Sequence, residues 1–362
     1  MSEFYIDPDI KKAETLPASF YQSDAIFEQL KDKVFGNSFQ WFGSVSELLP
    51  VEDFVKPLRF IEGFIEEPFF LKKTDGKAFC FSNVCTHRGN LIFHHEGPSK
   101  RITCGYHGRQ WKNDGTVKFM PEFSDVENFP RACDHLKAFK TAFLGPHLFV
   151  GIDTNMAIDA VFSKMKERIG FLPLEDFIID PNHNKDYLVN CHWALYCDNY
   201  LEGFHIPFVH EDLNAALDYG AYKTELFDNG SLQIGYASGG DEVFDLPEGH
   251  PDSGKAVSAY YYWVFPNMMF NFYPWGLSVN IVRPLSKHKT RVLFRSYVWD
   301  ENKLEEGAGA LLDKVEREDE FVVEGVHKGL QSSTYQTGRF SPKREQGVHH
   351  FHRLLAASLS KT

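Results

Sequence analysis

The sequence predicts an α+β protein of two domains, a small antiparallel β domain and a larger domain whose antiparallel sheet is flanked by helices. The chain of 362 residues is longer than one ordinary hydrophobic core requires. Short alternating runs separated by turn signals fill about residues 40–153, and longer apolar runs follow. We expect a helical lead-in over 1–39 that packs on the larger domain, then domains over 40–153 and 154–362.

Turn dipeptides define the small domain. Asp75-Gly76 and Asp114-Gly115 each stand between two strand-like runs, where such pairs favour tight hairpins. In the larger domain the pattern predicts helices near 24–35, 159–170 and 302–333. Strand-like runs lie within 186–205, 231–238, 259–273, 277–285 and 290–299.

Composition excludes some classes of function. Lys and Arg number 38 against 50 Asp and Glu, a net charge of −12 that disfavours binding to a nucleic-acid backbone. No apolar stretch reaches about eighteen residues, which argues against a membrane span. The acidic, proline-containing start is unlike a signal peptide, so we expect a cytoplasmic protein. In a reducing compartment, Cys and His clusters indicate metal or redox sites.

The first such cluster is Cys85-x-His87, followed after sixteen residues by Cys104-x-x-His107. Two thiolates and two imidazoles suit either tetrahedral zinc or a [2Fe–2S] cluster. Zinc knuckles usually separate their first pair by two to four residues, whereas one residue separates Cys85 from His87. Nearby glycines would let backbone N–H groups approach cluster sulfurs. Both assignments stay open on these residues alone.

The second cluster is Glu202, His205 and His210. If residues 193–205 are helical, Glu202 and His205 share one face. Pro207 would then break the helix and turn His210 back toward His205. Two histidines that converge at a helix end would form a metal pair.

The C-terminal helix offers a third ligand. Its apolar stripe comprises four residues, Val315, Val322, Val326 and Leu330. Asp319 occupies the position that completes this stripe, so we expect it to face the core, where a carboxylate needs a partner or a metal. The neighbouring Glu316, Glu318 and Glu320 are interpreted as solvated helix charges. Two histidines and one carboxylate form the facial triad of non-haem Fe(II) oxygenases.

Together these motifs resemble the Rieske oxygenases. The pattern C-x-H…C-x-x-H, the segment N-x-x-E-x-x-H-x-x-x-x-H over 199–210 and the later "EDEFVVEGVHKGLQS" follow that family's order. The resemblance implies a catalytic domain of helix-grip type and one [2Fe–2S] cluster per subunit on Cys85, His87, Cys104 and His107. It also implies one Fe(2+) per subunit on His205, His210 and Asp319.

The resemblance further implies how electrons arrive. A separate flavin/iron-sulfur reductase or a ferredoxin supplies them, ultimately from NAD(P)H, for reaction of O₂ with a small molecule. Cluster and iron of neighbouring subunits work together in a homotrimer. Glu202 occupies the position of the carboxylate that bridges a cluster histidine to an iron histidine.

The C-terminal stretch 326–355 resembles the choline-monooxygenase-like subgroup, which implies hydroxylation or demethylation of a quaternary ammonium compound. Such a cation needs an aromatic cage. Five residues could line one, although aromatic residues on a buried sheet are more often core: Tyr261, Trp263, Phe270, Phe272 and Trp275. The alternative within the family is an aromatic-ring-hydroxylating dioxygenase. Outside the class, a Rieske-type electron carrier or a zinc-stapled binding protein would leave Asp319 without a function.

Overall fold

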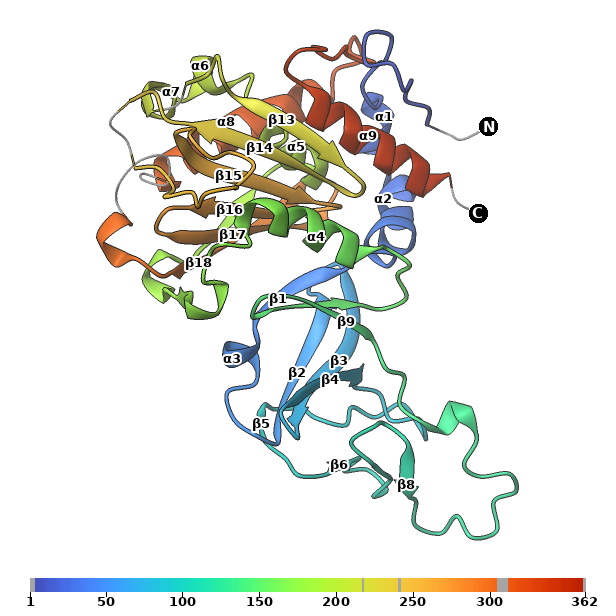
Figure 1. The fold of residues 1–362 in the computed structure, drawn as a ribbon. Coiled ribbons are helices and arrows are strands. Elements are labelled where there is room, and N and C mark those ends of the chain that lie inside the picture. The colour runs from blue at the N-terminus through green and yellow to red at the C-terminus, as the bar shows by residue number, and fades with distance from the viewer. Residues whose placement is uncertain (1–3, 217, 240–241, 305–311, 361–362) are drawn as a thin grey trace. The chain divides into compact units, whose positions relative to one another are not determined.

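The protein is described by a computed structural model that covers residues 4–216, 218–239, 242–304 and 312–360. Its residues form two compact units. Gly36–Asn155 forms one unit, and Met1–Phe35 belongs with Met156–Thr362 in the other. The α+β fold class predicted from the sequence is confirmed, because both units contain antiparallel sheets and the larger one is flanked by helices (Figure 1).

The smaller unit consists of short antiparallel sheets. Its strands pair as β1-β10-β9, β4-β3-β2-β5 and β6-β7-β8. Their bounds are β1 Gln40–Ser44, β2 Phe54–Ile61, β3 Ile65–Thr74, β4 Lys77–Ser82, β5 Gly97–Pro98, β6 Ile102–Thr103, β7 Gln110–Trp111, β8 Val117–Phe119, β9 Lys140–Leu144 and β10 His147–Gly151. A short helix, α3 (Val45–Leu48), follows β1, and a 3-10 turn, η2 (Ala132–Asp134), precedes β9.

The two predicted hairpins of this unit are confirmed. Asp75 and Gly76 join β3 to β4 with φ angles of 50° and 69°, the left-handed conformation that a two-residue hairpin turn requires. Asp114 and Gly115 lie between the paired strands β7 and β8.

One eight-stranded antiparallel sheet dominates the larger unit. Its order is β11-β18-β17-β16-β15-β14-β13, and β12 also pairs with β18. The bounds are β11 Ile178–Ile179, β12 Lys185–Val189, β13 Lys223–Phe227, β14 Gly230–Tyr236, β15 Val257–Val264, β16 Met268–Tyr273, β17 Gly276–Ser286 and β18 Lys289–Val298. The four strand-like runs predicted after residue 230 are confirmed. The run within 186–205 is a strand only to Val189, and a helix follows it.

Helices cover both faces of this sheet. They are α1 Ala18–Gln22, α2 Asp24–Leu30, η1 Lys31–Phe35 (a π-helix), α4 Ile158–Ile169, α5 Trp193–Tyr200, α6 Ile206–Val209, α7 Glu211–Ala216, α8 Leu312–Gly329 and α9 Gln346–Leu359. Three short 3-10 turns complete the described elements: η3 Leu174–Asp176, η4 Pro181–His183 and η5 Glu301–Lys303. The helices predicted near 24–35 and 159–170 are confirmed. Of the helix predicted over 302–333, Leu312–Gly329 is helical, and residues 305–311 lie outside the described residues.

Alternation along the strands separates the two faces. Tyr262 of β15 donates a hydrogen bond to the carbonyl of Met165 in α4, at 3.3 Å. Asn271 of β16, which pairs with Tyr261, instead accepts from Tyr200 of α5. Because successive side chains point to opposite faces, α4 covers one face and α5 the other. Helix α5 also packs against α8 and α9 (Figure 1). None of the helices described is both long and apolar enough to cross a membrane.

Helix α9 fixes the end of α5 through a close approach at Gly347. A methyl group added there would overlap the carbonyl oxygen of Leu201, the C-cap residue of α5. We expect Gly347→Ala to lower the free energy of unfolding by about 1–3 kcal/mol, since backbone on both sides must move. Gly325→Ala is the matched control. Gly325 lies on an exposed part of α8 with open space around it. Its substitution by Ala should leave the free energy of unfolding unchanged or raise it by up to about 1 kcal/mol. Urea unfolding measures the stability of both variants. Equal changes in the free energy of unfolding for Gly347→Ala and Gly325→Ala would contradict the close packing at Gly347.

Candidate functional site

The His205 and His210 side chains converge after the end of α5. The helix ends at Tyr200, so the prediction that Glu202 and His205 share a helical face is wrong. Instead Glu202 folds over the following turn. Its Oε2 accepts the backbone N–H groups of Phe204 and His205, donors that the start of α6 leaves without helical partners. Pro207 lies in the first turn of the short helix α6 rather than breaking a longer one.

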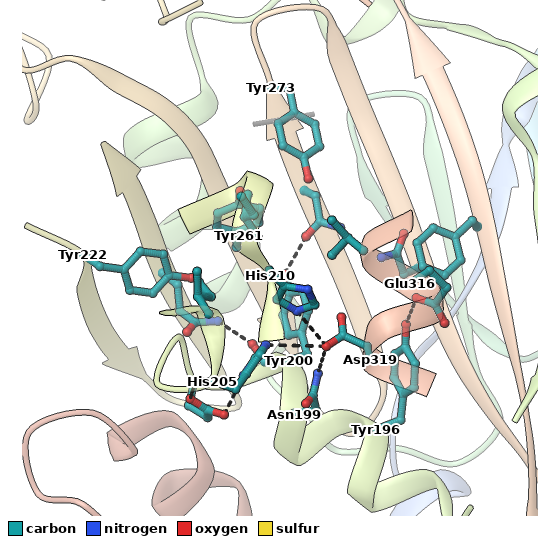
Figure 2. Close-up of a pocket in the computed structure, with 18 residues that line it drawn as sticks. Tyr196, Asn199, Tyr200, His205, His210, Tyr222, Tyr261, Tyr273, Glu316 and Asp319 are labelled. Carbon is teal, nitrogen blue, oxygen red and sulfur yellow. Dashed lines mark hydrogen bonds and ion pairs between the residues drawn. The ribbon is translucent and has the colours of Figure 1, made fainter. Parts of the chain in front are cut away.

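Asp319 of α8 faces both imidazoles, as predicted from the sequence. Its Oδ1 lies 3.0 Å from Nε2 of His210 and 3.5 Å from Nε2 of His205 (Figure 2). Asn199 donates its amide to the same oxygen at 2.6 Å. One potential ligand atom from each of His205, His210 and Asp319 falls within 4.8 Å of the others.

Two further carboxylates orient the imidazoles. Nδ1 of His205 lies 2.7 Å from Oε1 of Glu202, and Nδ1 of His210 lies 2.7 Å from Oε2 of Glu318. A proton on each Nδ1, donated to that carboxylate, would leave each Nε2 free to bind a metal beside Asp319. Two ligand atoms bonded at about 2.1 Å and at right angles to one metal lie about 3 Å apart. The donor set therefore fits a divalent metal.

The buried face of α8 differs from the predicted stripe. Val326 is 46% exposed, and the fully buried positions among the described side chains are Glu316, Val323, His327 and Leu330. Asp319 lies at the edge of this face, with its side chain 16% exposed. The interpretation of Glu316, Glu318 and Glu320 as solvated charges is wrong. Glu316 is only 3% exposed, Glu318 holds His210, and the Glu320 side chain is 15% exposed and pairs with Arg317.

A cavity of ≈ 110 Å³ opens beside the histidines and Asp319. Eighteen residues line it: Tyr196, Asn199, Tyr200, Glu202, His205, Ile206, His210, Leu213, Tyr222, Gln233, Tyr261, Asn271, Tyr273, Asn280, Phe294, Val315, Glu316 and Asp319 (Figure 2). Of the five aromatic residues that the sequence suggested, Tyr261 lines this cavity. The other four are buried in the core outside its lining.

Tyrosines from separate segments face this cavity, and no pattern in the sequence predicted that they would meet. Tyr200 comes from α5, Tyr222 from the segment before β13, Tyr261 from β15 and Tyr273 from β16 (Figure 2). Burial raises the pKa of each phenol above its ordinary value. All four phenols are therefore uncharged at pH 7.

The Glu316 carboxyl occupies the same lining. Its Oε2 accepts a hydrogen bond from the Tyr196 hydroxyl, and its Oε1 is buried without a partner among the described residues (Figure 2). Burial raises the pKa of Glu316 well above its usual value, the Tyr196 hydrogen bond opposes this, and the nearby Asp319 charge adds to the rise.

The first motif lies in the smaller unit on two loops, with Cys85 and His87 on one and Cys104 and His107 on the other. Both loops have the same hydrogen-bond pattern. The cysteine carbonyl accepts the N–H of the glycine four residues later, at 2.9 Å for Gly89 and 3.0 Å for Gly108. These glycines have φ angles of 73° and 74°, which favour glycine. The rings of His87 and His107 lie 4.9 Å apart between centroids.

Backbone N–H groups point at both cysteine sulfurs. Burial raises the pKa of Cys85, and N–H groups of His87 and Arg88 oppose that rise. For Cys104, burial is outweighed by the N–H groups of Tyr106 and His107 and by Asn90, so its pKa is lowered. Asn90 donates its amide to the Cys104 sulfur at 3.6 Å. Nδ1 of His87 is buried without a hydrogen-bond partner among the described residues, which suits a metal ligand. Donors aimed at sulfur suit an iron–sulfur cluster.

Comparisons with known proteins agree with this geometry. The family described as "Ring hydroxylating alpha subunit (catalytic domain)" matches residues 179–361, and the "Rieske [2Fe-2S] domain" matches residues 47–130. Choline monooxygenase of Arabidopsis thaliana is 28% identical, over 99% of this chain and 86% of that protein. The carnitine monooxygenase oxygenase subunit of Escherichia coli K12 is 28% identical, over 96% and 94%. A solved quaternary ammonium Rieske monooxygenase has a TM-score of 0.76 at 22% identity, over 99% and 100%, a likeness that supports the fold.

Glu318 was not predicted as part of the site, and its contact with His210 gives a direct test. We expect Glu318→Ala to weaken Fe(II) binding about 10–100-fold, because His210 loses the group that orients its imidazole. Glu320→Ala is the matched control, since Glu320 pairs with Arg317 at 2.8 Å instead. Anaerobic Fe(II) titration measures both affinities. Unchanged affinity in the Glu318 variant would show that this contact does not orient a ligand.

Proposed function

Because the chain belongs to the family of ring-hydroxylating oxygenase alpha subunits and carries a Rieske [2Fe–2S] domain, we propose that it hydroxylates or demethylates a small quaternary ammonium compound. The tyrosine-lined cavity beside His205, His210 and Asp319 carries this proposal. A quaternary nitrogen has no N–H to donate, so aromatic faces are the groups that attract it. The related choline and carnitine monooxygenases act on compounds of this class.

The proposed ligands follow from the two donor sets. Cys85, His87, Cys104 and His107 hold the [2Fe–2S] cluster, and His205, His210 and Asp319 hold the mononuclear iron. When bound, the cluster supplies electrons one at a time and the iron supplies the site of O₂ activation. Glu202 and Glu318 keep both imidazoles in the tautomer that frees Nε2. The tyrosines place the substrate and exclude water from it.

Residues 40–153 then form the electron-transfer domain and 154–362 the catalytic domain, with 1–39 packing on the latter. Rieske oxygenases receive their electrons from a reductase or ferredoxin partner. We propose that this chain works as a homotrimer in which Glu202 links His205 to a cluster histidine of the neighbouring subunit. The hydrogen bond that Glu202 accepts from Nδ1 of His205 supports that role, because a carboxylate can accept from more than one imidazole.

Single-turnover chemistry tests the function. The reduced holoenzyme should convert choline or L-carnitine with O₂, with ¹⁸O from labelled O₂ entering the product. His210→Ala should retain the cluster and form no product, because one of three iron ligands is gone. Mass spectrometry of the products measures this. A cis-diol from an arene, with no oxidation of any quaternary ammonium compound, would establish the ring-hydroxylating alternative and contradict the proposal.

The role of Glu202 has a separate test. We expect Glu202→Gln to slow oxidation of the reduced cluster by about 10–100-fold in single turnover, since an amide cannot accept from two imidazoles as a carboxylate does. Glu202→Asp keeps the charge and should recover part of the rate. Stopped-flow absorbance follows the cluster, and iron and sulfide analysis shows that both centres remain. A Gln variant that transfers electrons at the normal rate would remove Glu202 from the electron path.

A further inference from the structure

The Glu316 carboxyl has no assigned task in the metal site or the electron path, yet it is among the most buried acids of the described chain. It is 3% exposed and lines the cavity. Only its Oε2 has a described hydrogen-bond partner, the Tyr196 hydroxyl, and the buried Oε1 has none. A buried carboxyl with a free oxygen is costly unless a cation or a donor from outside the protein completes it.

The protein itself does not supply that cation. No lysine or arginine occurs among the eighteen described residues that line the cavity. Arg317 is adjacent in sequence, but its side chain is 60% exposed, pairs with Glu320 and lies 4.8 Å from the Tyr187 ring. It therefore points away from the Glu316 oxygen that lacks a partner.

An iron ion would not balance the site either. Four carboxylates belong to the proposed iron site or line the cavity, those of Glu202, Glu316, Glu318 and Asp319. Glu202 and Glu318 bond to the two histidines, and Asp319 faces both. The two positive charges of Fe(II) are thus already opposed by three carboxylates before Glu316 is counted. Among the described side chains, the cavity keeps a negative surplus that favours a cationic ligand.

The rest of the lining is neutral. Beside the four tyrosine rings lie the amides of Gln233, Asn271 and Asn280. The Asn271 oxygen accepts from Tyr200 at 2.6 Å and the Asn280 oxygen accepts from Ser278 at 2.9 Å, which leaves their N–H groups as donors. These donors can bind a hydroxyl group. They carry no charge to compensate a ligand carboxylate placed near Glu316 and Asp319.

We propose that Glu316 is the counter-ion of the substrate, and that the cavity selects a methylated ammonium with a neutral hydroxyl end over a zwitterion with a carboxylate. This inference rests on the proposed oxidation of quaternary ammonium compounds and narrows it to one charge class. The tyrosine rings contact the methyl groups, and the bound ammonium stabilises the charged form of Glu316, which burial alone disfavours. A zwitterion would add a carboxylate to a cavity that Glu202, Glu316 and Asp319 already line, which disfavours its binding.

Binding of three probes to the iron-loaded holoenzyme tests the inference: choline, L-carnitine and the neutral carbon isostere 3,3-dimethylbutan-1-ol. We expect wild type to bind choline at least about 10-fold more tightly than L-carnitine. Glu316→Gln should weaken choline binding at least about 10-fold and leave 3,3-dimethylbutan-1-ol within about 2-fold of wild type, because only the cation loses its counter-charge. Isothermal titration calorimetry measures each dissociation constant.

Two further variants separate charge from structure. Glu316→Asp keeps the carboxylate and should recover part of the choline affinity, whereas Glu320→Gln, outside the lining, should leave it unchanged. Choline binding that is indifferent to Glu316→Gln, equal losses for choline and its isostere, or tighter binding of L-carnitine would each overturn the inference while leaving the proposed function intact. If wild type binds neither choline nor L-carnitine, the proposed function fails and the inference fails with it.

Discussion

An excess of partly buried negative charge is the constraint on which this site depends. Glu202, Glu316, Glu318 and Asp319 surround two imidazoles at one side of the large sheet. Carboxylates are rarely buried without partners, because desolvation disfavours their charged form. Here the compensating charges have to come from outside the polypeptide. We propose that a divalent iron balances part of this charge and that a cationic substrate balances the remainder.

The fold produces this arrangement by ending one helix early. If α5 continued beyond Tyr200, Glu202 could not turn back onto the N–H groups of the next turn, and His205 would keep a helical direction. The turn and the short α6 instead bring the His210 side chain next to Asp319, where His205 also lies. Helix α8 then contributes Asp319 as the facing group and Glu318 as the support for His210. The proposed iron ligation and the orientation of its imidazoles therefore depend on the same few contacts.

Local patterns in the sequence predicted much of the fold. The Asp75-Gly76 hairpin and the strands after residue 230 follow from turn chemistry and periodicity. Periodicity also singled out Asp319, which faces both histidines from the edge of the buried face of α8. The buried role of Glu316 could not be predicted, because the buried positions of α8 before Leu330 lie one residue after those of its apolar stripe. The tyrosines could not be grouped either, since Tyr200, Tyr222 and Tyr273 come from separate elements that only the tertiary structure brings together.

Iron and acid-labile sulfide, measured per chain on protein purified without oxygen, test the central claim most directly. The account predicts about three irons and two sulfides, one [2Fe–2S] cluster and one mononuclear site, with one iron lost and both sulfides kept in His210→Ala. Zinc without sulfide would make Cys85, His87, Cys104 and His107 a structural metal site. Two irons that no added Fe(II) raises to three would contradict the assignment of His205, His210 and Asp319 as an iron site.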